Sequence, residues 1–154
     1  MKTALCSEVL KALAGKSLVT AESLTGGGIG AAITSVSGAS AVYKGGIISY
    51  TNEVKEALLC VPKDVLERYG AVSAWTAGYM AAGARNLLRA DVAVSVTGLA
   101  GPGGDDKGNP VGLVFVGYAD DKRITSRRFV FSGDREEVRK QAVEEALKLI
   151  LELN

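Results

Sequence analysis

The stretch Ser17–Val36, SLVTAESLTGGGIGAAITSV, decides the fold of this chain. Residues 17–22 are mostly apolar and predict a short strand, whereas residues 29–36 predict a helix. Between them the chain passes through Ser23 and three consecutive glycines, Gly26–Gly28. A strand that turns through glycines into a helix is typical of an open α/β sheet, in which ligands bind beyond the carboxyl ends of the strands. We therefore expect Ser23 to be exposed at that edge.

The rest of the chain completes an α/β pattern. Apolar runs predict further strands at residues 43–49, 91–97, 111–118 and 124–131. Helical periodicity and capping residues predict helices at residues 3–14, 53–59 and 62–69, one after Ser73, and a last one that begins with a capping box of Asp134 and Glu137. The helix after Ser73 is expected to bury Ala77, Met80, Ala81, Ala84, Leu87 and Leu88.

The connections between these elements predict the topology. Only Asp120–Lys122 separate the last two strands, which is too short for a crossover, so that pair must be antiparallel. The fold class is therefore α/β, a three-layer α/β/α sandwich around a mixed five-stranded sheet. Residues 1–154 contain no repeat or linker, and we expect them to form a single domain.

Composition excludes several kinds of active site. The chain has no histidine, which removes Ser-His-Asp and Cys-His catalysis and most zinc and iron sites. Two cysteines, Cys6 and Cys60, make neither a disulfide framework nor a zinc site. A metal-free hydrolase of this composition must use Lys, Tyr, Asp or Glu as its base. We expect no metal and no cofactor.

Charge and hydropathy limit the partners. The net charge is +1 and no basic stripe is present, so nucleic acid is not expected. The first residues, MKTALCSEVL, predict an amphipathic helix rather than a signal peptide, and no apolar run is long enough to span a bilayer. We expect a cytoplasmic protein with a small-molecule ligand and no membrane contact. The sequence is compatible with a homo-oligomer but does not fix the oligomeric state.

The turn after the first strand is the first candidate site. Its glycines would let the N–H groups of Thr25, Gly26 and Gly27 converge on an anion, either a phosphate or a developing oxyanion. Ser23 could then be a nucleophile, or simply a helix cap in a tight turn. Gly26, Gly28 and Ala31 also fit the dinucleotide pattern G-x-G-x-x-A, but the acidic residue that this fingerprint needs about twenty positions later is missing.

The segment ISYTNEVK, residues 48–55, supplies a candidate base. Tyr50 ends a strand, and Lys55 falls in the first turn of the helix that Thr51 or Asn52 would cap. The positive end of a helix lowers the pKa of a lysine, and a neutral lysine can act as a general base. The alternative is an ordinary surface lysine beside Glu56.

Two further segments could bind the rest of a ligand. Thr97 and Gly98 end a strand and open a long loop to Pro110 that contains Gly101, and a loop of this length is usually functional. Arg135 begins the last helix and could clamp a phosphate or carboxylate, or pair with an acidic neighbour.

Taken together, AESLTGG, ISYTNEVK, GAVS, VTGLAGPGG and SGDREEVR, in this order and spacing, resemble the C-terminal domain of the competence/damage-inducible protein CinA. That family includes stand-alone nicotinamide mononucleotide deamidases, which hydrolyse the carboxamide of this nucleotide to nicotinate mononucleotide and ammonia without a metal. In longer relatives the domain follows a molybdopterin-binding-type domain, which residues 1–154 do not include. The family fold is a three-layer sandwich with a mixed sheet.

The resemblance implies roles for particular residues. Ser23 would be the nucleophile and Lys55 its partner, with Tyr50 orienting or relaying. Thr97, Gly98, Gly101 and Arg135 would bind the substrate, a pyridine nucleotide. The chain departs from the family pattern at Leu24, where cysteine is usual, at Ala74 and Trp75, where glutamate is frequent, and at Cys60, where glycine is usual.

Two other functions use the same residues differently. A nucleotide-sensing module would need the glycine loops and Arg135 but has no use for Lys55. A nucleotide-dependent oxidoreductase would need the acidic residue that the fingerprint lacks.

Overall fold

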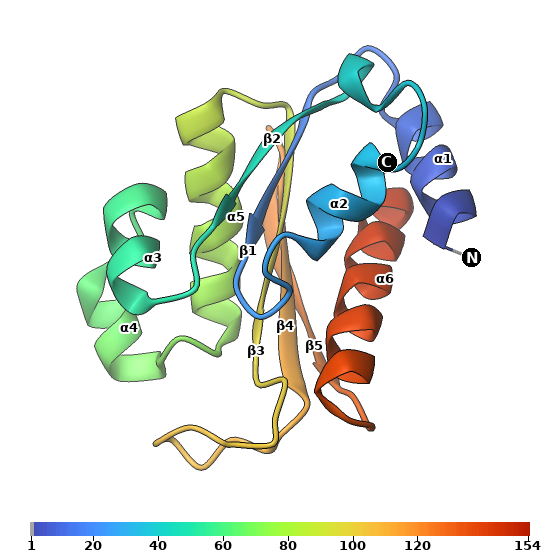
Figure 1. The fold of residues 1–154 in the computed structure, drawn as a ribbon. Helices are drawn as coiled ribbons and strands as arrows, with labels where there is room; N and C mark the ends of the chain where they lie inside the picture. The colour runs from blue at the N-terminus through green and yellow to red at the C-terminus, as the bar shows by residue number, and fades with distance from the viewer. Residues whose placement is uncertain (1) are drawn as a thin grey trace.

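A computed structural model describes residues 2–154, and in this range helices and strands follow one another in the predicted order (Figure 1). The strands are β1 (Leu18–Glu22), β2 (Tyr43–Ile48), β3 (Val92–Gly98), β4 (Leu113–Ala119) and β5 (Ile124–Val130). The α-helices are α1 (Lys2–Ala12), α2 (Gly28–Thr34), α3 (Asn52–Leu59), α4 (Lys63–Tyr69), α5 (Ala74–Leu88) and α6 (Arg135–Leu153), and residues Ala39–Ala41 form a short 3-10 turn.

The five strands form one mixed sheet in the order β2-β1-β3-β4-β5. β1 lies between β2 and β3 and runs parallel to both, so the carboxyl ends of these three strands meet at one edge. β4 is antiparallel to β3 and to β5. The predicted fold class and the antiparallel last pair are confirmed, and the β3–β4 pair is antiparallel as well.

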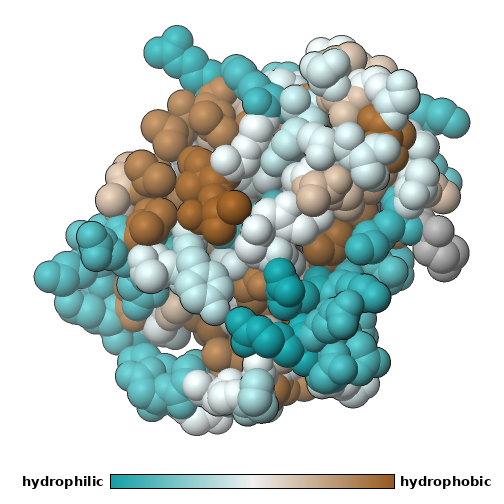
Figure 2. Space-filling model, viewed as in Figure 1, coloured by the Kyte–Doolittle hydropathy of each residue, from teal (hydrophilic) through white to brown (hydrophobic). Residues whose placement is uncertain are grey.

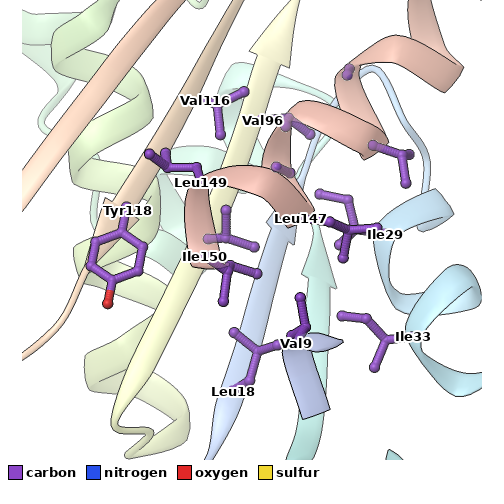
Figure 3. Close-up of a cluster of buried hydrophobic side chains, with 14 of the residues drawn as sticks. Val9, Leu18, Ile29, Ile33, Val96, Val116, Tyr118, Leu147, Leu149 and Ile150 are labelled. Atoms are coloured by element: carbon purple, nitrogen blue, oxygen red, sulfur yellow. The ribbon is translucent and has the colours of Figure 1, made fainter. Parts of the chain in front are cut away.

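Helices cover both faces of the sheet (Figure 1). α1, α2 and α6 pack on one face, where the alternate residues Val92, Val94 and Val96 of β3 join the larger apolar core. Figure 3 shows Leu147 and Ile150 of α6 over Leu18 and Val96 of the sheet. α5 covers the other face, with α3 and α4 outside it, and forms a second core. The central strand β3 is thus buried on both faces, as its apolar sequence predicts.

Two glycines let α5 sit close to its neighbours. A Cβ at Gly117 of β4 would lie 2.3 Å from the carbonyl oxygen of Ala77, and a Cβ at Gly83 would lie 1.9 Å from that of Leu59. The second contact brings the end of α3 directly against α5. Glycine at position 83 therefore leaves room for α3, the helix that carries Lys55, to pack directly against α5.

Two details differ from the sequence prediction. Leu87 is 52% exposed rather than buried, because the inner position of the last turn of α5 is taken by Leu88, which packs against the second core. β4 begins at Leu113 rather than Val111, because Gly112 has a φ of 92°, in the left-handed region, which interrupts an extended strand.

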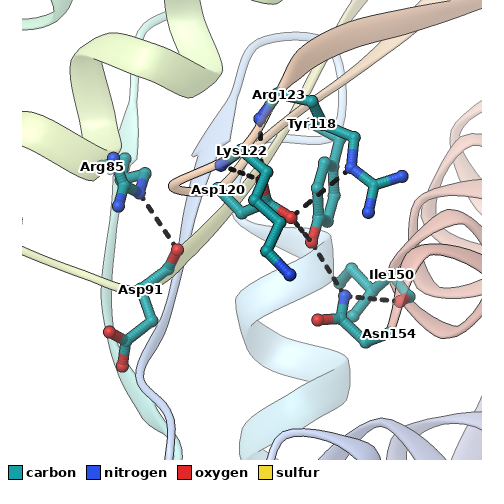
Figure 4. Close-up of polar contacts among 8 residues, drawn as sticks. All are labelled: Arg85, Asp91, Tyr118, Asp120, Lys122, Arg123, Ile150 and Asn154. Carbon is teal, nitrogen blue, oxygen red and sulfur yellow. Dashed lines mark hydrogen bonds and ion pairs between the residues drawn. The ribbon is translucent and has the colours of Figure 1, made fainter.

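A polar network closes the end of the sheet opposite to the carboxyl ends of the parallel strands (Figure 4). The hydroxyl of the fully buried Tyr118 donates to Asp120 at 2.9 Å and accepts from the side-chain amide of Asn154 at 2.9 Å. Burial raises the pKa of Tyr118 to about 12, so its hydroxyl stays protonated. No helix within residues 2–154 has the length and apolarity required to cross a membrane.

Candidate active site

A cavity of about 770 Å³ opens at the edge where β1 and β3 end. Its wall includes Ser23 from the end of β1, Lys55 from α3, Thr97 and Gly98 from β3, and Arg135 from α6. The remaining wall comes from Leu24, the segment between β2 and α3, other residues of α3, α4, the turn before α5, and the loop that follows β3. The lower part of the view in Figure 2, where this loop and the start of α6 lie, is largely hydrophilic, whereas an apolar area lies higher up over α5 and β2.

Ser23 and Lys55 form a buried pair at the floor of this cavity. The Nζ atom of Lys55 lies 3.0 Å from the Oγ atom of Ser23. Lys55 is 1% exposed and Ser23 is 7% exposed, so the expectation of an exposed Ser23 is wrong. The serine lines the cavity and can be reached from it. This excludes the alternative interpretation of Lys55 as a solvated surface lysine.

Burial changes the acid–base chemistry of the lysine. Removal from water disfavours its charged form and lowers the pKa of Lys55 from the usual 10.5 to about 8. Burial is the cause of this shift, whereas the sequence suggested the positive end of the helix as a cause. At neutral pH, about one Lys55 in ten therefore lacks its proton, against fewer than about one in a thousand for a solvated lysine.

Main-chain carbonyl groups orient the amine of Lys55. Nζ lies 2.7 Å from the carbonyl oxygen of Ser49 and 3.3 Å from that of Tyr50. A neutral amine has two N–H donors and one lone pair. If the two donors serve the two carbonyls, the lone pair is directed at the hydroxyl of Ser23. This is the arrangement that a base needs in order to remove the proton of a nucleophile.

The turn Thr25–Gly27 is not brought into the cavity. The carboxylate of Glu22, 2% exposed, accepts hydrogen bonds from the hydroxyl of Thr25 at 2.6 Å and from the N–H groups of Ile29 at 2.8 Å and Gly30 at 3.0 Å. The N–H of Gly26 is bonded to the carbonyl of Ser23. The start of α2 thus already holds an internal anion.

The carbonyl side of the same turn is held by α6. The guanidinium of Arg139 donates to the carbonyl oxygen of Leu24 at 2.9 Å and to that of Thr25 at 3.3 Å. The turn is therefore fixed from both sides. Thr25, Gly26 and Gly27, the predicted anion loop, instead form the support that holds Ser23 in place, and the occupied helix start also disfavours a dinucleotide at this turn.

The predicted substrate-binding residues do line the cavity: Thr97, Gly98, Gly101 and Arg135. Arg135 reaches across it, donating through Nη1 to the carbonyl of Gly101 at 2.7 Å and through Nη2 to the hydroxyl of Tyr50 at 3.3 Å. Thr97 donates to the carbonyl of Ala71 at 2.6 Å. The hydroxyl of Tyr50 thus meets Arg135, whereas Lys55 meets the main chain of Tyr50 rather than its side chain.

Comparison with known proteins identifies the family. The profile of the CinA C-terminal domain matches residues 2–154. The chain belongs to the CinA C-terminal domain family. A CinA-like protein of Endomicrobium trichonymphae is 47% identical over 135 residues, which are 88% of this chain and 32% of that protein. A putative competence-damage inducible protein of Thermoanaerobacter pseudethanolicus is also 47% identical, over 86% of this chain and 32% of its own length. The CinA domain described here therefore spans about a third of these relatives.

Solved structures agree with the fold of this CinA domain over its whole length. A CinA superfamily protein from Escherichia coli superposes with a TM-score of 0.97 at 34% identity and covers 100% of this chain and 91% of that one. The competence/damage inducible protein CihA from Agrobacterium tumefaciens gives a TM-score of 0.95 at 38% identity, covering 99% and 95%.

Sequence reasoning missed Glu22 and Arg139 in this CinA domain. An acidic residue a few positions before a glycine-rich helix start can accept hydrogen bonds from the first N–H groups of the helix, so Glu22 carried a usable signal. The burial of Lys55 also had a signal in the sequence. Lys55 lies four residues before the buried Leu59 and thus occupies an inward position of α3. For Arg139 no local signal exists, because its partners lie more than a hundred residues away, at separations of 115 and 114.

Proposed function

We propose that this CinA domain is an amidohydrolase that converts nicotinamide mononucleotide to nicotinate mononucleotide and ammonia by Ser-Lys catalysis. The observation that carries the proposal is the 3.0 Å contact between Lys55 Nζ and Ser23 Oγ at the base of a ligand-sized cavity. The substrate comes from the resemblance of the motifs to the stand-alone deamidases. A lysine whose pKa is lowered and which lies beside a serine can serve as the base of an amidase without histidine.

The first half-reaction forms an acyl-enzyme. Neutral Lys55 takes the proton of Ser23 as Oγ attacks the carboxamide carbon. The tetrahedral intermediate then breaks its C–N bond, and the lysine returns the proton to the departing nitrogen, which leaves as ammonia. Water next attacks the ester, giving its proton to Lys55, and the carboxylate product leaves as Ser23 regains a proton. Each proton passes through one buried amine, which the two carbonyls of Ser49 and Tyr50 hold in position.

The remaining lining residues suit the ribose phosphate. The guanidinium of Arg135 has a planar fork of donors that matches phosphate oxygens, and some of these donors are left beyond its bonds to Gly101 and Tyr50. Gly98 at the end of β3 and Gly101 in the loop that follows contribute to the same wall. The predictions that no metal or cofactor is needed and that the protein acts in the cytoplasm belong to this proposal. Association of this chain into a homo-oligomer is likewise a prediction that belongs to the proposal.

The decisive experiment measures ammonia release from nicotinamide mononucleotide by the purified protein, in strong chelator and without it. We expect equal rates in the two conditions and none from Ser23→Ala. Tight binding of the nucleotide without ammonia release at any pH would instead identify a sensing module. Activity that is lost in chelator and restored by a divalent cation would contradict the metal-free mechanism.

A further inference from the structure

Tyr50 is the only aromatic residue among the described residues that line the cavity. Its side chain is 60% exposed, although it stands next to a buried pair. Within residues 2–154, no other aromatic ring stacks on it and no cation lies over it. A large ring left uncovered in a cavity is a surface available to a ligand.

Tyr50 is held by one hydrogen bond to its main chain and one to its side chain. The main-chain carbonyl of Tyr50 accepts from Lys55 at 3.3 Å, and its hydroxyl accepts from Arg135 at 3.3 Å. The ring therefore stands between the candidate base and the candidate phosphate anchor. In a nicotinamide nucleotide the aromatic ring likewise stands between the carboxamide and the ribose phosphate.

The charges around the cavity favour a positive ligand ring. Five carboxylates line it, against four basic side chains, and one of these, Lys55, is partly neutral. The carboxylates are Glu53, Glu56, Glu67, Asp105 and Asp106, and the basic side chains are Lys55, Lys63, Lys107 and Arg135. The face of a tyrosine ring is also the negative part of its quadrupole and attracts cations.

We propose that Tyr50 is a specificity-determining residue whose ring stacks on the positively charged pyridinium ring of the substrate and so selects pyridinium amides over neutral aromatic amides. The inference rests on the proposed function, whose substrate carries that charge. It gives Tyr50 a role different from a proton relay, because the hydroxyl is bonded to Arg135 and not to Ser23 or Lys55.

The test compares two ligands on the full chain carrying Ser23→Ala, which cannot turn them over. One ligand is nicotinamide mononucleotide, and the other is its benzamide analogue, which has the same shape but a neutral ring. Binding of each is measured by calorimetry before and after Tyr50→Leu and Tyr50→Phe. Tyr79→Leu is the matched control, since Tyr79 is also partly exposed but lies outside this cavity.

A cation–π contact in a partly desolvated site predicts that Tyr50→Leu weakens binding of the pyridinium nucleotide about 5- to 30-fold. The same change should weaken the neutral analogue less than about threefold, because only dispersion is lost. Tyr50→Phe should keep the preference between the two ligands, and Tyr79→Leu should change neither affinity. Thermal unfolding of each variant checks that the fold is intact.

Equal losses for both ligands after Tyr50→Leu would overturn the inference, as would a Tyr50→Phe variant that loses the preference. Failure of the pyridinium nucleotide to bind at all would overturn it too. A wild-type protein that binds this nucleotide but releases no ammonia removes the proposed reaction, whereas the ring preference measured in the binding experiment still stands.

Discussion

Lys55 makes the rate of the proposed reaction depend on pH in a way that the structure fixes. Burial lowers its pKa from 10.5 to about 8, and only the neutral form can accept the proton of Ser23. The neutral fraction is about one-tenth one pH unit below this pKa and about nine-tenths one unit above it. We therefore expect kcat/KM to rise roughly tenfold between pH 7 and 9 and then level off. A solvated lysine would give roughly a hundredfold rise over the same range, with no plateau.

The assay is ammonia release at low substrate concentration across this pH range, with the Ser23→Ala protein as the blank for non-enzymatic hydrolysis. Lys55→Arg should show almost no activity at any pH, because a guanidinium keeps its proton. NMR titration of the lysine side-chain signals, with Lys55→Met used to assign Lys55, should give the same midpoint as the rate. A flat profile between pH 7 and 9, or an active Lys55→Arg variant, would refute lysine as the base.

Other changes separate structure from chemistry. Ser23→Ala should abolish turnover but shift the free energy of unfolding by less than about 1.5 kcal/mol in urea titrations, since it removes one hydrogen bond. Arg135→Ala should raise KM for the nucleotide much more than for the nucleoside without phosphate; equal effects would make Arg135 structural. Glu22→Gln should destabilise the fold by about 1–3 kcal/mol, because one N–H of α2 would face the amide instead of an acceptor. Between pH 8 and 10.5 the unfolded chain holds the proton of Lys55 more tightly than the folded chain, so the stability of the wild type relative to Lys55→Met should rise with pH by about 3 kcal/mol; a pH-independent difference would contradict the lowered pKa.

Local patterns in the sequence sufficed for much of the fold. The strand–turn–helix of residues 18–34 follows from apolar residues and glycines that are neighbours in the chain. The last helix begins where Asp134 and Glu137 predicted it, with both hydrogen bonds of the capping box present. The direction of β4 against β3 was beyond prediction, because the intervening loop is long enough to return in either direction.

Part of the candidate site could be predicted from the sequence, but the burial of Ser23 and Lys55 could not. Ser23 and Lys55 lie 32 residues apart, and tertiary packing, which includes the close contact of α3 with α5 at Gly83, brings them to hydrogen-bond distance below the surface. The separation of two residues along the chain does not show how deeply they are buried. Burial is what lowers the pKa of Lys55. The role of Thr25–Gly27 was misjudged for a related reason, since the N–H groups behind this turn are already bonded to Glu22.

The carboxylate of Glu22 has a consequence for ligand selection by this fold. It competes for the start of α2 as a tethered group, whose effective concentration is far above that of any free metabolite. A phosphate arriving from solution would have to displace two charge-assisted hydrogen bonds and leave a buried charge unpaired. The sequence of the glycine-rich turn can thus match a nucleotide-binding pattern although its N–H donors are already bonded to Glu22 of the same chain. The proposed nucleotide site is therefore the neighbouring cavity, which Ser23 lines.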